Sequence, residues 1–185
     1  MDLPLVELRR YTLKPGRRDE MIAVFERHLM EPQEEQGVMV LGTFRDLDRP
    51  DQFVWVRGFP DMETRRKALD TFYSGPVWKE HGPAVGQTMI DSDDVHLLRP
   101  TGPGTGMDPG PRPLPPFDAD PPGTTVYVTF GETPDAIATF VTETAENTYP
   151  ALPVHEGVSV TVSLSRTRPA GEAARLTPTA RSPLR

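Results

Sequence analysis

The order of its regular segments is the feature that most constrains how this chain can fold. Within residues 1–100, strand-like runs are interspersed with segments whose apolar residues recur at helical spacing, and Pro, Gly or Asp residues separate them. The expected elements are, in chain order, strand 5–13, helix 17–31, strand 38–46, strand 52–59, helix 61–73, a short helix at 77–85 and strand 94–99. Apart from the short helix, this β-α-β-β-α-β order is that of a ferredoxin-like antiparallel sheet with helices on one face, an α+β fold.

A Pro/Gly-rich stretch follows this first unit. Residues 101–124 contain few large apolar side chains, so they cannot bury enough surface to offset their ordering entropy, and we interpret them as a linker. Residues 125–185 begin again with a strand, a helix expected over residues 134–147, a period-2 strand in VSVTVSLSR and a closing strand in RLTPTARS. The sequence therefore predicts a second, incomplete ferredoxin-like unit in tandem. Because it would leave the first sheet partly uncovered, we expect a homodimer or higher oligomer.

Charge and cysteine content exclude several classes of partner and site. The formal net charge of −7 disfavours binding to nucleic acids or anionic membrane surfaces, since both require a basic face. The chain has no cysteine, so disulfides, thiolate nucleophiles and thiolate metal sites are excluded. The N-terminus shows no leader pattern, and no apolar run is long enough to span a membrane, so a cytoplasmic location is expected.

The first strand carries more charge than the central strand of a small domain is expected to have. Because side chains alternate across a strand, Glu7, Arg9 and Tyr11 share one face, while Val6 and Leu8 share the other. We expect the apolar face to pack on the helices and the charged face to be enclosed by a second sheet, in a barrel built from two chains or from two halves of one chain. The enclosed face would then line a ligand cavity with apolar walls and a few polar groups.

Three residues of this strand are candidates for a site. Arg9 is predicted to anchor an anion, Tyr11 to donate a proton or a hydrogen bond, and Glu7 to bind the ligand beside them. The competing interpretation is an ion pair between Glu7 and an arginine across strands, which would stabilise a barrel interface and hold no ligand.

The third strand adds an aromatic group beside a guanidinium. Trp55 and Arg57 are expected to share the enclosed face with Phe53, and a Trp next to an Arg is suited to hold a planar acid by stacking and charge. Core packing between two sheets is the alternative role for these ligand-binding candidates.

The segment FYSGPVWKEH, residues 72–81, is expected at the mouth of the barrel. Tyr73 and Trp78 are ligand-binding candidates there, and His81 is a catalytic candidate because its imidazole titrates near neutral pH. The alternative is that the aromatic side chains of this segment anchor a loop on the core.

No metal site is predicted. His28 and Glu31 lie one helical turn apart, but the spacing is generic, no third histidine is close in the sequence, and the surrounding charges indicate a solvated face. His96 and His155 stand singly in strand and loop contexts, where structural roles are expected. The glycines of residues 102–110 lack the Lys-Ser/Thr pair of a phosphate-binding loop.

Several of these segments, taken together, resemble a known family. Similarity to the NIPSNAP family of the dimeric α/β-barrel superfamily covers residues 5–100 and lies in ELRRYTLKPG, VLGTFRD, QFVWVRGFPD, FYSGPVWKEH and HLLRP. Longer members of the family have a second repeat, and a shortened form of it is expected here because TVYVTF and RLTPTARSPLR resemble parts of that repeat. The resemblance implies a ferredoxin-like barrel. Relatives in the wider superfamily include cofactor-independent monooxygenases, isomerases, haem-degrading enzymes and aldoxime dehydratases.

Three functions of different classes remain open. The first is an enzyme without metal or organic cofactor that acts by proton transfer or oxygen-dependent oxidation on an aromatic or polyketide-like small molecule. The second is a module that binds such a ligand, or a haem, without turnover. The third is a dimerising protein-interaction domain. The charged strand favours the first two, because a pure dimer interface tends to be more apolar.

Overall fold

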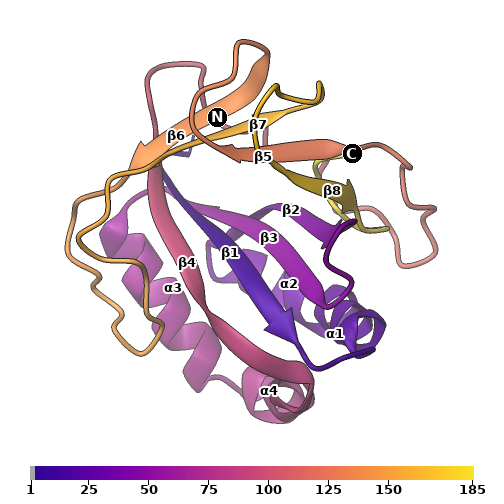
Figure 1. Cartoon of the computed structure of the whole chain (residues 1–185). Coiled ribbons are helices and arrows are strands. Elements are labelled where there is room, and N and C mark those ends of the chain that lie inside the picture. Colours follow the sequence, from indigo (N-terminus) through magenta and orange to yellow (C-terminus); the bar gives the residue numbers. More distant parts are fainter. Residues whose placement is uncertain (1–2) are drawn as a thin grey trace.

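Eight antiparallel strands close into one barrel in the computed structural model, which describes residues 3–185 (Figure 1). The strands are β1 (Leu5–Leu13), β2 (Met39–Asp46), β3 (Gln52–Phe59), β4 (Met89–Pro100), β5 (Val126–Phe130), β6 (Ala136–Thr142), β7 (Thr161–Ser165) and β8 (Ala174–Pro178). Their order around the barrel is β1-β3-β2-β8-β5-β7-β6-β4, and β4 returns to pair with β1. Closure therefore needs no second copy of the chain, and the oligomer expected from the sequence stays a prediction.

All helices pack on the outside of the first four strands (Figure 1). They are α1 (Arg18–Val24), the π-helical turn η1 (Phe25–Leu29), α2 (Met30–Glu35), α3 (Met62–Ser74) and α4 (Pro76–Thr88). The apolar stripe of the first helical region is buried in the cluster between sheet and helices, and it consists of Met21, Ile22, Phe25 and Leu29. Residues 101–185 contain no helix. None of the helices in the described part of the chain is both long and apolar enough to cross a membrane.

All four strands expected in the first hundred residues are present, although β4 begins at Met89 and not at residue 94, and the second and third of them form the predicted hairpin. Asp61 is the N-cap of α3, because its carboxylate accepts a hydrogen bond from the Thr64 backbone N at 2.6 Å. The first helical region does not end at Pro32, however. Helical residues run without a break from Arg18 through η1 and α2 to Glu35, so Pro32 lies inside this run, shortly after the π-helical turn.

The Pro/Gly-rich segment joins β4 to β5 without a helix or strand of its own. It lies against the rest of the protein at a few points. Met107 is buried in the core of the barrel, Leu114 is buried beside the helices, and Arg112 donates to the carbonyl oxygen of Val40 at 2.7 Å. These anchors offset part of the entropy lost in ordering a segment that has so few apolar side chains.

The helix expected over residues 134–147 is wrong, because the segment forms strand β6. Ile137, Phe140 and Val141 recur at helical spacing, but they are β-branched or aromatic residues, which favour a strand. In the strand, Phe140 points into the barrel and is 1% exposed, whereas Ile137 points outwards and is 40% exposed. Pairing with β4 and β7 supplies the backbone hydrogen bonds that a helix would have made internally.

The interior of the barrel is filled by apolar side chains from both parts of the chain. Strands β1 to β4 contribute Val6, Leu8, Leu41, Phe44, Val54, Val56 and Leu98. Strands β5 to β8 contribute Val126, Val128, Ala138, Phe140, Val162, Leu164 and Leu176. The lumen is therefore a packed hydrophobic core and not the ligand cavity that the sequence predicts.

The predicted orientation of β1 and β3 is thereby reversed. Glu7 bonds to Arg65 on α3, and Tyr11 and Trp55 pack with side chains of the helices, so this face lies beneath the helices. The apolar face, with Leu8, points into the barrel. Alternation alone cannot choose between the two orientations, because both faces of β1 are buried.

Replacing Phe140 by Ala should lower the free energy of unfolding by about 3–5 kcal/mol, because a large buried ring is lost from the barrel interior. The matched control on the same strand is Ile137→Ala, which removes a half-exposed side chain and should change stability far less. Equilibrium urea denaturation measures both changes. A comparable loss in the two variants would contradict the strand and support a helix that buries both residues on one side.

Candidate functional site

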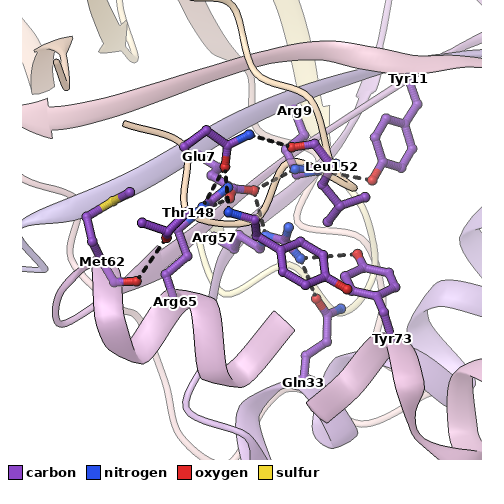
Figure 2. A network of polar contacts seen from close by, with 12 residues as sticks. Glu7, Arg9, Tyr11, Gln33, Arg57, Met62, Arg65, Tyr73, Thr148 and Leu152 are labelled. Atoms are coloured by element: carbon purple, nitrogen blue, oxygen red, sulfur yellow. Dashed lines mark hydrogen bonds and ion pairs between the residues drawn. The ribbon is translucent and has the colours of Figure 1, made fainter. Parts of the chain in front are cut away.

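A buried carboxylate and three arginines form the main polar cluster between the sheet and the helices (Figure 2). Glu7 Oε2 accepts a hydrogen bond from Arg9 Nη1 at 2.6 Å and another from Arg57 Nε at 2.8 Å. The other oxygen, Oε1, accepts one from Arg65 Nε at 2.6 Å. One carboxylate is therefore shared by three guanidinium groups, and we call these four residues the arginine cluster.

The pairing of β1 with β3 brings most of the cluster together. Glu7 lies opposite Arg57 in this ladder, and Arg9 lies opposite Trp55, so these side chains are neighbours on one face of the sheet. Helix α3 crosses the same face and supplies Arg65 from the helix layer. Two adjacent strands and one helix thus meet at a single carboxylate (Figure 2).

Positive charge exceeds negative charge in the arginine cluster. The side chains of its four members are at most 2% exposed, and within residues 3–185 Glu7 is the only carboxylate that pairs with them. Arg57 Nη2 and Arg65 Nη2 are buried and have no hydrogen-bond partner among the described residues. The cluster therefore carries a net excess of two buried positive charges, three guanidinium groups against one carboxylate, and such an excess is costly to bury.

Neutral side chains accept other hydrogen bonds of the guanidinium groups. Arg9 Nε donates to Tyr11 Oη at 3.1 Å. Arg57 Nη1 donates to Gln33 Oε1 at 3.1 Å and to Tyr73 Oη at 3.3 Å. These partners orient the guanidinium groups, but they do not neutralise them.

Burial and the arginines act in opposite directions on the pKa of Glu7. Burial raises it, but the positive charges of Arg57, Arg9 and Arg65 outweigh this effect and hold the pKa well below its usual 4.5. For Arg9 the directions are reversed: burial lowers its pKa, but Tyr11 and Glu7 beside it raise that pKa above its usual value. Both groups are therefore ionised at neutral pH.

Two residues at this site escape prediction from the strand pattern. Arg65 precedes Ala68 and Leu69 by about one helical turn, so it lies on the apolar stripe with which α3 faces the sheet. Gln33 follows Leu29 by one turn on the stripe of the first helical region, and its amide is also buried. A charged or polar residue in the middle of an apolar stripe was the available signal for both.

A small aromatic cavity of about 20 Å³ adjoins the arginine cluster. Its walls come from β1, β3 and the helices and are formed by Tyr11, Met21, Phe25, Leu29, Gln33, Trp55, Phe72, Tyr73, Trp78 and Val85. The guanidinium groups of Arg9 and Arg57 lie 5.6 and 5.0 Å from the Trp55 ring centroid. Trp55 Nε1 is buried and has no hydrogen-bond partner in residues 3–185. The aromatic cavity thus combines apolar walls with an unused donor beside two cations.

The predicted site residues gather beneath the helices and not in the barrel lumen. Four of them line the aromatic cavity and three belong to the arginine cluster: Tyr11, Trp55, Tyr73 and Trp78, and Glu7, Arg9 and Arg57. Phe53 lies behind them, with its ring centroid 6.2 Å from that of Tyr11 and 5.3 Å from that of Phe25. Phe53 packs against the cavity walls and is not one of the lining residues.

His81 lies apart from these residues. Its imidazole stacks on that of His28 where α4 meets η1, with 3.8 Å between the ring centroids. Glu31 forms an ion pair with Arg181 of the C-terminal segment, so it does not join His28 as a second ligand group. The predicted catalytic imidazole is therefore not among the groups that line the aromatic cavity.

A second group of titratable side chains lies at β4. Asp94 Oδ1 is 2.9 Å from His155 Nε2 and 3.9 Å from His96 Nε2. Burial and the neighbouring His155 lower the pKa of His96 to about 4, so its imidazole is neutral at pH 7. The sequence gives no signal for this group, because 61 residues separate Asp94 from His155.

Comparison with known proteins identifies one family. The NIPSNAP family model matches residues 6–103. The crystal structure of an uncharacterized NIPSNAP-like domain protein from Burkholderia xenovorans has a TM-score of 0.53 and 23% sequence identity, and the match covers 61% of this chain and 98% of that chain. A NIPSNAP family protein with unknown function from Agrobacterium tumefaciens str. C58 has a TM-score of 0.50 and 19% identity, with coverage of 55% and 94%. These identities show a shared fold alone. No functionally curated protein matches the chain.

Replacing Glu7 by Gln should lower the free energy of unfolding by about 3–5 kcal/mol, because three buried guanidinium groups lose their shared carboxylate. The matched control is Glu63→Gln, which removes an exposed carboxylate paired with Arg66 and Lys67 on α3 and should leave stability nearly unchanged. Urea denaturation near neutral pH measures both. Similar small effects of the two substitutions would contradict the charge balance described for the arginine cluster.

The cost of Glu7→Gln should shrink in acid. Because the native pKa of Glu7 lies below 4.5, the unfolded chain takes up a proton at this position before the native protein does as the pH falls below about 4.5. The stability that ionised Glu7 contributes is present above that pH and is lost as the pH falls towards the native pKa. Unfolding free energies of the unsubstituted chain and the variant at about pH 7 and about pH 3 measure the change. A difference that stays constant between these pH values would mean that the arginines do not hold Glu7 ionised.

Proposed function

The chain belongs to the NIPSNAP family, and we propose that it binds a small planar organic acid in the aromatic cavity beneath its helices. The excess of buried positive charge beside this cavity is the observation that carries the proposal, since three guanidinium groups share the single carboxylate of Glu7. An anionic ligand would supply a second negative charge beside the guanidinium groups. Pairing with it would offset part of the free energy that their burial costs, and this would favour binding.

The carboxylate of such a ligand would lie against Arg57. Nη2 of Arg57 is buried and has no partner among the described residues. Nη1 of Arg57 bonds only to the neutral side chains of Gln33 and Tyr73. A guanidinium binds a carboxylate through two parallel hydrogen bonds, which are stronger than bonds between neutral groups. A ligand carboxylate would satisfy Nη2 and replace the Tyr73 hydroxyl at Nη1.

The remaining walls suit a flat apolar body. The rings of Tyr73 and Trp78 meet edge to face with 4.8 Å between centroids, and those of Tyr11 and Trp55 meet edge to face at 6.1 Å. Such rings offer flat apolar surfaces to a planar molecule, and the free Trp55 Nε1 offers one further hydrogen bond. A compact aromatic acid of the size of benzoate is therefore the class of ligand that we propose.

Binding would require the aromatic cavity to open, because about 20 Å³ holds about one water molecule. Tyr73 and Trp78 lie on either side of Gly75, the residue between α3 and α4, so a shift of this turn would widen the cavity. The wall formed by Phe25 and Leu29 belongs to η1, and π-helical turns occur frequently at functional sites. We therefore place the opening movement at the turn around Gly75.

Binding without turnover is favoured by the chemistry of the walls. The residues that line the aromatic cavity include no carboxylate and no imidazole. Proton transfer at a bound ligand would fall to the hydroxyl groups of Tyr11 and Tyr73. Any cofactor-independent chemistry in this cavity would thus depend on a tyrosine.

Intrinsic fluorescence tests the proposal directly, because both tryptophans of the chain, Trp55 and Trp78, line the cavity. Benzoate should change the fluorescence in a saturable way. It should also bind at least about tenfold more tightly than benzamide, a neutral analogue of similar shape, because only benzoate forms charge-assisted hydrogen bonds with Arg57. Equal affinity for the two compounds, or no saturable change with benzoate, would overturn the proposal.

Two variants separate the contributions of charge and shape. Arg57→Met should weaken benzoate binding by about tenfold or more, and Val85→Phe should block it by filling the cavity without removing a charge. The control is Arg66→Met, which removes an exposed guanidinium paired with Glu63 on α3 and should leave binding unchanged. Thermal unfolding shows whether each variant is folded. Retention of full affinity in both folded cavity variants would contradict the proposed site.

A further inference from the structure

The pairing of β1 with β4 places an acid and an imidazole on the inner face of the barrel. His96 lies opposite Leu8, and Asp94 lies opposite Arg10. Leu8 belongs to the apolar core inside the barrel, and alternate residues of a strand share a face. Asp94 and His96 therefore lie on the opposite face of the sheet from the aromatic cavity.

His155 reaches the same place from the loop that joins β6 to β7. Strand β6 pairs with β4 only over residues 98–100, so the edge of β4 before these residues is open to another segment. The backbone N–H of His155 donates to the carbonyl oxygen of Val95 at 2.8 Å. This hydrogen bond fixes the loop beside Asp94 and His96.

The two imidazoles converge on one carboxylate oxygen. Asp94 Oδ1 is 2.9 Å from His155 Nε2 and 3.9 Å from His96 Nε2, and the three ligand atoms lie within 4.8 Å of one another. Bonds of about 2.0–2.2 Å to a tetrahedral metal ion place ligand atoms about 3.4 Å apart, so small adjustments would suffice. Arg10 Nη2 lies 3.0 Å from Oδ2 and 3.2 Å from Oδ1, and it orients the carboxylate from the other side.

His96 has no hydrogen bond that accounts for its position. Its side chain is 9% exposed, and Nδ1 is buried without a partner in the part of the chain that the structure describes. The 3.9 Å between Nε2 and Asp94 Oδ1 exceeds hydrogen-bond distance. Nε2, the nitrogen that faces Asp94, therefore forms no hydrogen bond with this carboxylate, and a neutral imidazole can offer the lone pair of this nitrogen to a metal ion.

From this geometry we propose that Asp94, His96 and His155 bind a divalent first-row transition metal ion, such as Zn²⁺. Two imidazole nitrogens and one carboxylate oxygen are ligands that Zn²⁺ takes in sites with three protein ligands, where a fourth position stays open. A pocket of about 290 Å³ at this end of the barrel is lined in part by Arg10 and Phe130. The ring centroid of Phe130 lies 5.1 Å from that of His96. An ion here would therefore lie beside a space for a second, exogenous ligand.

The site is tested by titrating the chelator-treated full chain with ZnCl₂ in an isothermal titration calorimeter. The unsubstituted chain should bind one ion in a saturable way. His155→Ala changes a half-exposed loop residue and should weaken binding by about 100-fold or more, because loss of even an outer partner of a metal ligand costs about 10–100-fold. Asp94→Asn should weaken binding in the same direction, since it removes the negative charge and one carboxylate oxygen.

The four histidines of the chain provide a matched control. The two outside the proposed site, His28 of η1 and His81 of α4, stack on each other, and the double variant His28→Ala/His81→Ala should bind Zn²⁺ as tightly as the unsubstituted chain. Three results would each overturn the proposal: no saturable binding of Zn²⁺, unchanged affinity in His155→Ala, or loss of binding in the double variant alone.

Discussion

The carboxylate of Glu7 ties helix α3 to strands β1 and β3. It accepts hydrogen bonds from arginines on two adjacent strands and on α3, so a single side chain links β1, β3 and the helix layer. The low-dielectric interior makes these contacts strong and also makes the guanidinium groups costly to bury without them. Asn147, in the loop after β6, accepts a hydrogen bond from Arg65 and extends the network into the second part of the chain. The aromatic cavity lies against this network, because Gln33 and Tyr73, which line it, accept hydrogen bonds from Arg57.

Closure of the barrel depends on two short ladders and a shared core. The β2–β8 and β4–β6 ladders each have three residue pairs, compared with eight between β1 and β3. The C-terminal segment strengthens the first ladder, because Thr43 Oγ1 and Thr179 Oγ1 are 2.6 Å apart and Arg181 pairs with Glu31 on α2. Apolar side chains from both parts of the chain meet in one interior cluster, and their burial supplies most of the attraction between the two parts.

Local pattern predicts the strands and helices of residues 1–100 because each has its own period and its own stop signals. The orientation of β1 does not follow from its period, since Leu8 on one face and Glu7 on the other are equally buried. The site residues divide in the same way. Neighbours along β1 and β3 can be grouped from the sequence, whereas Arg65 joins them only through the packing of α3. Asp94 and His155 meet through loop geometry that no motif spacing encodes.

The two parts of the barrel share one strand order, β4-β1-β3-β2 and β8-β5-β7-β6, but only the first carries helices. A barrel assembled from two identical four-stranded units would carry every site twice, related by a twofold axis, and ligands could then couple across that axis. Within residues 3–185 the arginine cluster occurs once. Under the function proposed above, each barrel would therefore bind one molecule of the organic acid at the arginine cluster along a simple hyperbolic curve, although its strand order occurs twice.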